Sequence, residues 1–347
     1  MRIGILLPGI FALGNPGNGV FEQAKQQARA LEALGHKVVE LNPWQWQDEK
    51  KLDVIHFYSG GPALRGIEHL FDSSQRPALV FSPIIDSNKS FVSYRIAALM
   101  GGLVPAVITV PGEFRRQAIA SDIVVCRSAS EKERVCRGMG ISPQKVRIVL
   151  NGTSIPDTVD GDASRVQREL DLPDKFVLHV SAFTQERKNV LRLVAAMEKL
   201  EYPLVIAGSS VAGPVSASLL RKCGNSKRLR VLGFVDHATK AALYSLCRVF
   251  CLPSIHEGTG LSALEAGARG ARLVITKKGG TPDYFKNYVE YVDPYSIAGI
   301  REAIVRAWSR PDSDELRQYI RRDLTWEASA RALEQVYISL HTGRTRT

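Results

Sequence analysis

The sequence has few cysteines and no long apolar segment. Its 347 residues include five cysteines and no C-x-x-C pair, so we expect neither a disulfide framework nor a zinc module, and a reducing compartment fits best. No apolar run reaches the length of about 18 residues that a membrane-spanning helix needs. The longest candidate, Ile96 to Val110, is interrupted by Gly101, Gly102 and Pro105. A membrane-spanning protein is therefore not expected.

The first residues, MRIGILLPGIFALG, have some features of a signal sequence, but they hold one basic residue and are broken by Pro8 and Gly9. We expect a core strand followed by a glycine-rich loop, and a cytoplasmic protein. The loop, residues 9–19, lacks the G-x-G-x-x-G spacing of dinucleotide-binding proteins, so an NAD enzyme is not expected. Gly17 and Gly19 can instead bring backbone N–H groups close to an anionic or sugar ligand. A plain tight turn is the alternative.

The net charge of +11 invites a nucleic-acid or membrane interpretation. The basic excess, however, is spread over both halves of the chain. The one dense basic cluster has no aromatic residue to stack on a base, so we expect a solvated surface and no nucleic-acid groove. Peripheral attraction to an anionic membrane or a negatively charged glycan remains a hypothesis. The cluster consists of Arg221, Lys222, Lys227, Arg228 and Arg230.

Short Val-, Ile- and Leu-rich runs alternate with longer amphipathic stretches, which is typical of parallel sheets flanked by helices. The predicted fold class is α/β, with two doubly wound Rossmann-like domains facing across a cleft. The expected strands of the first domain are Ile3–Leu7, Lys37–Leu41, Val54–Tyr58, Ala78–Ser82, Ile123–Cys126 and Val146–Leu150. Those of the second are Phe176–Val180, Leu204–Ala207, Arg230–Leu232, Val249–Leu252, Arg272–Thr276 and Glu290–Val292.

Three segments follow from this pattern. We expect residues 1–155 to form an N-terminal Rossmann-like domain, and residues 156–323, which begin with the polar stretch Pro156–Asp162, to form a second one. Residues 324–347 are expected to contain a further amphipathic helix. The apolar residues of this helix fall at helical spacing, which predicts that they pack in a core. They are Ala330, Leu333, Val336, Tyr337 and Leu340.

The segment from Pro253 to Glu265 contains two glutamates on either side of a Gly-Thr-Gly turn. It follows the expected strand Val249–Leu252, and ligands of open α/β sheets bind at the carboxyl ends of strands. Glu257 precedes the turn, and Glu265 lies in the short helix that follows it. The first amides of that helix and the positive end of its dipole suit a phosphate. We expect a loop-plus-helix arrangement in which both carboxylates reach one ligand.

Glu265 has an alternative role, because Ser262-x-x-Glu265 also matches a capping box, in which the glutamate bonds a backbone N–H. The ligand-binding interpretation is favoured because Ser254 and Glu257 occur with a later glycine pair, Gly279-Gly280.

Taken together, these motifs resemble those of retaining glycosyltransferases of the two-domain B architecture (GT-B), family 4. Glu257 to Glu265 resembles the family's E-x7-E signature. The resemblance covers nearly all of residues 1–335 and is specific in the second half. It implies that residues 1–155 are the acceptor-side domain, that residues 156–323 are the nucleotide-sugar donor domain, and that the helix in residues 324–347 crosses back to the first domain. Further matching segments are Asn151-Gly-Thr153, Arg187-Lys-Asn189, Leu232-Gly-Phe-Val235 and Gly279-Gly-Thr-Pro-Asp283.

The resemblance implies that Lys188, with Arg187, meets the diphosphate of a nucleotide sugar. Glu257 would contact the transferred sugar, and Glu265 would hold the ribose hydroxyls. Because departure of the diphosphate develops negative charge, fixed cations and N–H dipoles can stabilise it, so we expect no metal and no cofactor beyond the donor substrate. Further candidate donor-binding residues are Gly258, Thr259, Gly260, Leu261, Gly208, Phe234, Gly17 and Gly19.

Three positions depart from the family pattern. Ser181 and Ala182 stand where many members have an arginine, and Arg187 is a candidate substitute. Thr259 replaces an aromatic residue. The fourth strand is followed by Pro-Ile-Ile-Asp86 where members often place a histidine, so Asp86 either takes a polar role or leaves this position empty.

The expected function is transfer of a sugar, with retention of anomeric configuration, from a nucleotide-diphosphate sugar to a glycan, lipid-linked or small-molecule acceptor, in bacterial-type polysaccharide or glycoconjugate biosynthesis. The resemblance implies that the departing phosphate oxygen serves as the base. Two alternatives stay open. One is a nucleotide-sugar 2-epimerase on the same fold, and the other is a non-catalytic nucleotide-sugar or nucleic-acid binding protein.

Overall fold

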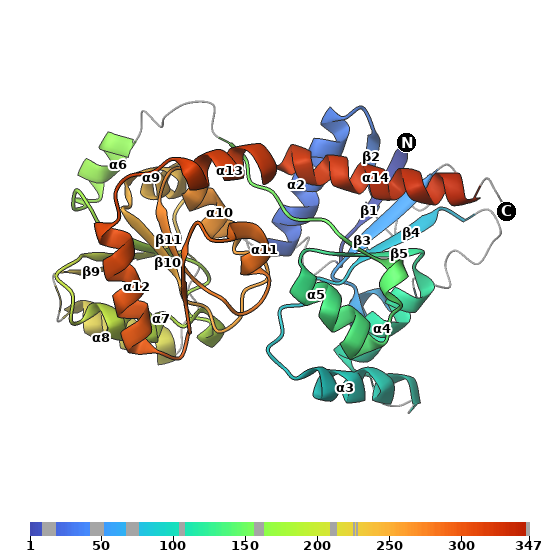
Figure 1. The fold of residues 1–347 in the computed structure, drawn as a ribbon, viewed down its shortest axis with the longest axis horizontal. Helices are drawn as coiled ribbons and strands as arrows, with labels where there is room; N and C mark the ends of the chain where they lie inside the picture. Colours follow the sequence, from blue (N-terminus) through green and yellow to red (C-terminus); the bar gives the residue numbers. More distant parts are fainter. Residues whose placement is uncertain are drawn as a thin grey trace. The chain divides into compact units, whose positions relative to one another are not determined.

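The computed structural model describes residues 1–8, 19–41, 52–66, 76–103, 108–155, 163–208, 214–224, 226 and 228–344. The chain forms two compact units (Figure 1). Unit 1 comprises residues 1–152 and 326–347, and unit 2 comprises residues 153–325. The corresponding boundaries expected from the sequence follow residues 155 and 323. The polar stretch Pro156–Asp162 lies outside the described residues.

In its described residues, unit 1 contains a six-stranded parallel sheet with the order β2-β1-β3-β4-β5-β6. The central strands are buried along their whole length, because helices cover a parallel sheet and apolar side chains therefore suit both faces. Phe57 and Phe81 stack in the core with ring centroids 4.6 Å apart. The strands are β1 (Arg2–Leu6), β2 (Lys37–Glu40), β3 (Val54–Tyr58), β4 (Ala78–Ser82), β5 (Ile123–Cys126) and β6 (Val146–Ile148).

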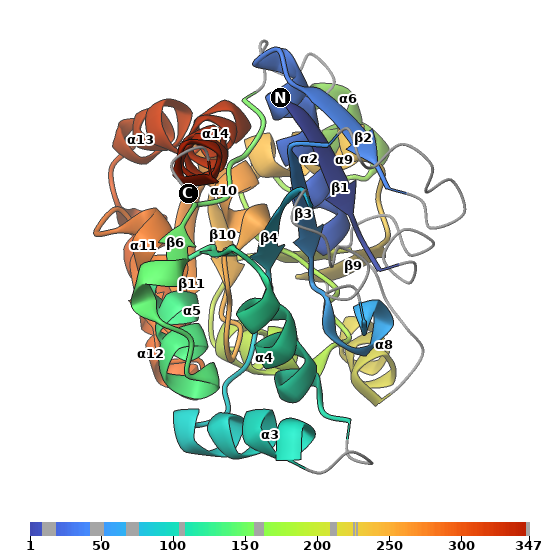
Figure 2. The same ribbon diagram turned by 90° about the vertical axis from the view of Figure 1, so that its right-hand side faces the viewer.

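The C-terminal helix α14 (Trp326–Arg344) packs against α2 (Gly19–Ala33) within unit 1 (Figure 2). Four of the five apolar positions expected to pack are buried, and Leu340 is half-buried. A buried polar network adds to this contact. His56 lies 2.7 Å from the Tyr337 hydroxyl, and Gln27 donates to Ser329. The other helices of unit 1 are η3 (Gly61–Leu64), α3 (Phe91–Leu103), α4 (Val110–Ala120), α5 (Ala129–Glu133), η5 (Arg134–Gly138) and η6 (Pro143–Lys145).

In unit 2 the described residues form a second six-stranded parallel sheet, with the order β12-β11-β10-β7-β8-β9. Counted in chain order within the unit, this is the order 3-2-1-4-5-6 of dinucleotide-binding α/β domains. The order reverses between β7 and β10, and this switch point is where such sheets bind ligands. The strands are β7 (Val177–Val180), β8 (Leu204–Ala207), β9 (Leu229–Gly233), β10 (Val249–Leu252), β11 (Arg272–Thr276) and β12 (Glu290–Val292).

The helices of unit 2 bury apolar faces against this sheet, and a core cluster combines residues of α7, α12 and strands of the sheet. The predicted class, α/β with two doubly wound sheets, is confirmed, and all expected strands are present with ends within two residues. The helices are α6 (Ala163–Glu169), η7 (Glu186–Lys188), α7 (Val190–Met197), α8 (Pro214–Gly224), α9 (His237–Leu246), α10 (Leu261–Ala268), α11 (Thr281–Phe285), α12 (Ile297–Ser309) and α13 (Glu315–Asp323).

Among the described residues, no helix combines the length and the apolar character needed to cross a membrane.

Candidate functional site

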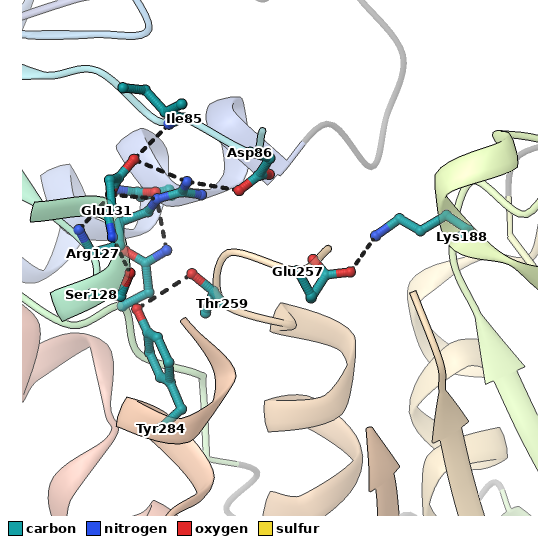
Figure 3. A network of polar contacts seen from close by, with 11 residues as sticks. Ile85, Asp86, Arg127, Ser128, Glu131, Lys188, Glu257, Thr259 and Tyr284 are labelled. Atoms are coloured by element: carbon teal, nitrogen blue, oxygen red, sulfur yellow. Dashed lines mark hydrogen bonds and ion pairs between the residues drawn. The ribbon is translucent and has the colours of Figure 1, made fainter. Parts of the chain in front are cut away.

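Lys188 and Glu257, 69 positions apart in the sequence, form an ion pair in unit 2 (Figure 3). The Lys188 ammonium donates to Glu257 Oε2 at 2.7 Å, and the Ser254 hydroxyl donates to the same oxygen at 3.0 Å. Lys188 follows β7 and Glu257 follows β10, so the pair lies at the switch point of the sheet. Both side chains are about nine-tenths buried. The two residues that the sequence assigned to diphosphate and sugar thus lie side by side.

Asn189 ties together the loops that carry this pair. It adopts a left-handed backbone conformation with φ 61°, which asparagine tolerates better than most residues. Its Nδ2 atom donates to the carbonyl oxygens of Pro253 and Pro294, and its Oδ1 atom accepts from Arg192. Because Lys188 is the preceding residue, this clamp sets the position of its backbone.

The Glu257 backbone is also bonded to the loop after β11. Its amide donates to the Lys278 carbonyl, and its own carbonyl accepts from the Gly280 amide. Gly279 between them has φ +112°, and a Cβ atom built there would lie 2.1 Å from the Glu257 oxygen. Only glycine fits this position, which is the physical reason for the first glycine of the pair seen in the sequence.

Helix α10 begins at Leu261, with Gly260 as its N-cap in the left-handed conformation and no side-chain cap. The capping-box alternative for Glu265 is therefore wrong, because Ser262 lies inside the first turn and does not precede it. The Ala263 and Leu264 amides donate to the Gly260 carbonyl. By helix geometry the amides before them have no intrahelical acceptor, so this end of α10 has donors of the kind a phosphate needs.

Glu265 forms an ion pair with Lys240 of α9, at 3.1 Å from Nζ to Oε2. Both side chains are about one-quarter exposed. The structure therefore separates the two glutamates of the signature, because Glu257 contacts the loop after β7 whereas Glu265 contacts α9. Buried Tyr244 packs close by, and desolvation, with the Glu265 carboxylate as a further cause, raises the pKa of its hydroxyl well above 10.

Gly208 and Phe234 lie on the neighbouring loops of the same sheet edge. The Gly208 amide donates to the Gly233 carbonyl at 2.7 Å. A Cβ atom on Gly208, whose φ is +123°, would lie 1.9 Å from the Ser181 carbonyl oxygen, so a side chain is excluded there. Phe234 follows Gly233 and is 61% exposed. An exposed aromatic ring at a strand end is available to stack on a nucleobase.

Ser181, one of the departures from the family pattern, is hydrogen-bonded to His179. His179 Nδ1 lies 2.8 Å from the Cys251 carbonyl oxygen, which can only accept, so Nδ1 carries the proton. Nε2 then accepts from the Ser181 hydroxyl at 2.7 Å. Burial lowers the pKa of His179 to about 4, which keeps the ring neutral and holds Ser181 in a fixed orientation.

The remaining candidates are placed as follows. Arg187 is exposed and donates to Gln185, and its side chain has no recorded contact with the Lys188–Glu257 pair among the described residues. Thr259 is buried and donates to the Tyr284 hydroxyl at 3.3 Å. Gly19 is the first residue of α2. Gly17 lies outside the described residues.

In unit 1, Asp86 is paired with a buried arginine (Figure 3). Arg127, which follows β5, donates to Asp86 Oδ1 at 3.0 Å and to both Glu131 oxygens at 3.2 Å. Glu131 also accepts from the Ile85 amide. This network fixes the loop after β4, where Ile84 has φ 54°, an unfavourable value for a β-branched residue. Asp86 therefore has a definite structural partner.

Sequence reasoning missed Lys240, Arg127 and Glu131. Lys240 has no local signal, because its partner lies 25 positions away. Glu131 does have a local sequence signal, because Ser128-x-x-Glu131 has the spacing of a capping box. Ser128 is indeed the N-cap of α5. The glutamate side chain accepts from the Arg127 amide and not from the Ser128 amide.

The basic cluster at residues 221–230 consists largely of ion pairs with acidic neighbours. Lys222 pairs with Glu198, and Arg228 pairs with Glu201. Arg230 lies 2.8 Å from Asp171. Lys227 lies outside the described residues. No group of three or more potential metal ligands occurs among the residues that were described.

Residues 160–323 match the family model described as Glycosyl transferases group 1. An uncharacterized glycosyltransferase of Methanocaldococcus jannaschii is 29% identical over 238 residues, which cover 62% of this chain and 59% of the relative. A serotype-specific mannosyltransferase of Escherichia coli is 29% identical over 208 residues, which cover 56% of this chain and 25% of the relative. The chain thus spans less than two-thirds of the length of either relative.

Solved structures agree on the fold over the whole chain. Sucrose-phosphate synthase from Thermosynechococcus elongatus superimposes with a TM-score of 0.74 at 18% identity and covers 99% of both chains. HepE from Anabaena, solved in complex with UDP, has a TM-score of 0.71 at 16% identity and covers 98% of this chain and 100% of that one. These similarities support the two-domain glycosyltransferase fold.

Proposed function

We propose that this protein is a retaining glycosyltransferase that moves a sugar from a nucleotide-diphosphate sugar to a hydroxyl of a glycan, lipid-linked or small-molecule acceptor. The observation that carries the proposal is the Lys188–Glu257 pair at the switch point of unit 2, within the segment that matches Glycosyl transferases group 1. The signature residues, and the family-4 resemblance they carry, support retention. The mannosyltransferase relative supports a hexose as the transferred sugar.

Each end of the donor has a suitable group in unit 2. The Lys188 ammonium and the first amides of α10 supply positive charge and N–H donors for a diphosphate. Glu257 Oε2 accepts from Lys188 and Ser254, and Oε1 has no recorded partner among the described residues, so it is available to accept from a sugar hydroxyl. Glu265, which is paired with Lys240, would accept from ribose hydroxyls when Lys240 moves away. The HepE complex with UDP supports a nucleoside diphosphate as the common part of the donor.

The reaction breaks the bond between the anomeric carbon and the phosphate oxygen, and the bonding electrons leave with the diphosphate. The acceptor oxygen bonds to the anomeric carbon on the same face, and its proton passes to the departing phosphate oxygen. Lys188 stabilises the charge that grows on the diphosphate, and Glu257 lies where positive charge grows on the sugar. Such preorganised groups need no reorganisation during the reaction.

We also propose that transfer needs no metal, because Lys188 and the α10 amides provide the positive field at the leaving group. EDTA is therefore expected to leave the rate largely unchanged. Complete loss of activity that Mg²⁺ or Mn²⁺ restores would contradict this part of the proposal.

Two measurements test the proposal as a whole. A thermal-shift panel of nucleoside diphosphates and nucleotide sugars identifies the donor, since a ligand at 100 times its dissociation constant stabilises the folded state by about 2.7 kcal/mol. The stabilising donor is then incubated with candidate acceptors, and the product anomer is assigned by NMR. Formation of a 2-epimer from donor alone would indicate the epimerase alternative, and donor binding without turnover against any acceptor would indicate the non-catalytic one.

A further inference from the structure

Helix α3 of unit 1 has an aliphatic stripe that faces solvent. Val92, Ile96, Leu99 and Met100 are 69%, 55%, 38% and 45% exposed. Their spacing of i, i+4, i+7 and i+8 places them on one side of the helix. The opposite side, which includes Tyr94 and Ala98, is buried. The helix is therefore apolar on both faces, and the described residues of unit 1 cover only one of them.

The covered face packs on α4 through a close glycine contact. A Cβ atom on Gly101 would lie 3.1 Å from the Gly112 Cα atom, and one on Gly112 would lie 2.9 Å from the Gly101 Cα atom. Thr109 joins the two helices, since its hydroxyl donates to the Ala97 carbonyl. In both views α3 lies beside α4 (Figures 1 and 2). The helix is thus firmly held while its aliphatic stripe points outward.

Two exposed basic residues, Lys89 and Arg95, flank Val92 in the sequence. Residues 87–120 contain four basic side chains and one acidic side chain, Glu113. Glu113 is 1% exposed, so it adds no negative charge to the surface. Arg137 of η5, which packs against α3, lies over the Phe91 ring and is paired with the exposed Glu133, so this pair adds no net charge. The four basic residues are Lys89, Arg95, Arg115 and Arg116.

We propose that the membrane face, defined as Val92, Ile96, Leu99 and Met100 with Lys89 and Arg95, docks unit 1 on an anionic lipid surface. Aliphatic side chains bordered by Lys and Arg are the composition of helices that lie in a lipid interface. Anionic headgroups complement the basic rim, and lipid chains accept the aliphatic stripe.

Other occupants fit this surface less well. A second copy of this chain, related by a two-fold axis, would bring the basic rim against itself, and like charges oppose such contact. A soluble glycan needs polar or aromatic partners, which an aliphatic stripe does not provide. The inference goes beyond the proposed sugar transfer and does not depend on it, because the residues involved belong to unit 1 alone.

Co-sedimentation of the full chain with phosphatidylcholine vesicles, prepared with and without phosphatidylglycerol, tests the proposal. We expect binding to the anionic vesicles, weaker binding at higher salt, and little binding to phosphatidylcholine alone. The double variant Ile96→Ser/Met100→Ser should lose most of the binding. Ile338→Ser, which changes an exposed aliphatic residue of α14 in the same unit, should retain it.

A second pair of variants separates the membrane face from overall charge. Arg95→Glu should weaken binding at least about fivefold, the factor expected for one basic residue near an anionic surface. Arg331→Glu makes the same charge change on α14 and should have a much smaller effect. Thermal unfolding and donor-induced thermal shifts should be the same in all variants, so failure of this inference is distinguishable from failure of the proposed activity.

Three outcomes overturn the proposal. The first is no binding to anionic vesicles. The second is equal loss of binding in the membrane-face and control variants, which indicates non-specific attraction of a basic protein. The third is a dimer in analytical ultracentrifugation that dissociates in Ile96→Ser/Met100→Ser, which would make the same face a protein interface.

Discussion

Glu257 and Glu265 have different neighbours, and this difference predicts different contributions to the proposed reaction. Glu257 is buried between Lys188 and Ser254, where the sugar and the first phosphate of a donor would meet. Glu265 is half-buried against Lys240, one helical turn inside α10. Under the proposed function, Glu257 would act near the bond that breaks, and Glu265 would contact the part of the donor that does not react.

We expect Glu257→Gln to lower kcat more than it weakens donor binding, because its charge acts on the positive charge that develops at the anomeric carbon. Glu265→Gln should act mainly on donor KM, since a ribose contact contributes equally in ground and transition states. Steady-state kinetics of both variants measure this split. Normal turnover of Glu257→Gln would show that the proposed active site is wrong at its centre.

Lys188 and Arg187 are adjacent in sequence but differ in exposure, and this predicts unequal effects. Lys188→Ala should lower kcat/KM by about 10²–10³-fold. This corresponds to about 2.7–4 kcal/mol of lost transition-state stabilisation, the range for one preorganised donor at a developing anion. Arg187→Ala should cost less, because its side chain is exposed and bonded to Gln185. Lys222→Ala, a surface lysine of α8, controls for loss of one positive charge. Equal kcat/KM in wild type, both single variants and the double variant would remove Lys188 from the donor site.

At the scale of elements, the loops after β7, β10 and β11 act as one assembly. Asn189 bonds the loop after β10, and the Glu257 backbone bonds the loop after β11 in both directions. The loops after neighbouring parallel strands emerge at one edge of the sheet, so such cross-bonds hold the side chains that these loops carry. Gly208 and Gly279 at this edge are required by close contact with backbone carbonyl groups.

Gly279→Ala tests this assembly. A Cβ atom there would meet the Glu257 carbonyl oxygen at 2.1 Å, in a backbone conformation that itself costs about 1–2 kcal/mol for a non-glycine residue. Gly270→Ala is the matched control, because it has φ +94° and no atom within 4 Å of its Cβ position. We expect Gly279→Ala to be more destabilised than Gly270→Ala in chemical denaturation and to lose sugar transfer. Equal unfolding free energies of the two variants would indicate that the loop accommodates the added Cβ atom without loss of stability.

At the scale of the whole molecule, each unit contains a fully buried histidine. Burial lowers the pKa of His56 in unit 1 to about 3 and that of His179 in unit 2 to about 4, from 6.5. Below pH 6.5 the unfolded chain binds protons that the folded chain does not, so folding stability falls as the pH falls. Both histidines remain neutral in the folded state down to their lowered pKa values. The loss of folding stability therefore occurs between pH 6.5 and these values.

We expect the free energy of unfolding to be highest above pH 6.5 and to decline toward pH 4, by up to about 1.4 kcal/mol per pH unit for each histidine. Denaturation at a series of pH values measures the slope. His56→Gln should flatten the slope, whatever it does to stability at pH 7, whereas the exposed His237→Gln should leave it unchanged. A slope that is the same in wild type and His56→Gln would assign the pH dependence to other groups.

The sequence by itself determined the strands, the class and the motif positions. Buried parallel strands appear as continuous apolar runs such as Val54–Tyr58 and Leu204–Ala207, and helices end at glycines such as Gly35, which has φ +88°. These signals are local, since a run of apolar residues or a positive φ is specified by the residues themselves. The resemblance then supplied roles for Lys188, Glu257 and Glu265.

Only the tertiary structure decided which of these residues meet. Lys188 and Glu257 are adjacent because the strand order of unit 2 places β7 beside β10, and no local pattern records strand order. The partners Lys240 of Glu265 and Arg127 of Asp86 depend on the same long-range packing. Exposure is decided in the same way: Val92 and Tyr94 are both apolar residues of one helix, yet α4 and η5 cover one face of that helix and leave the other to solvent.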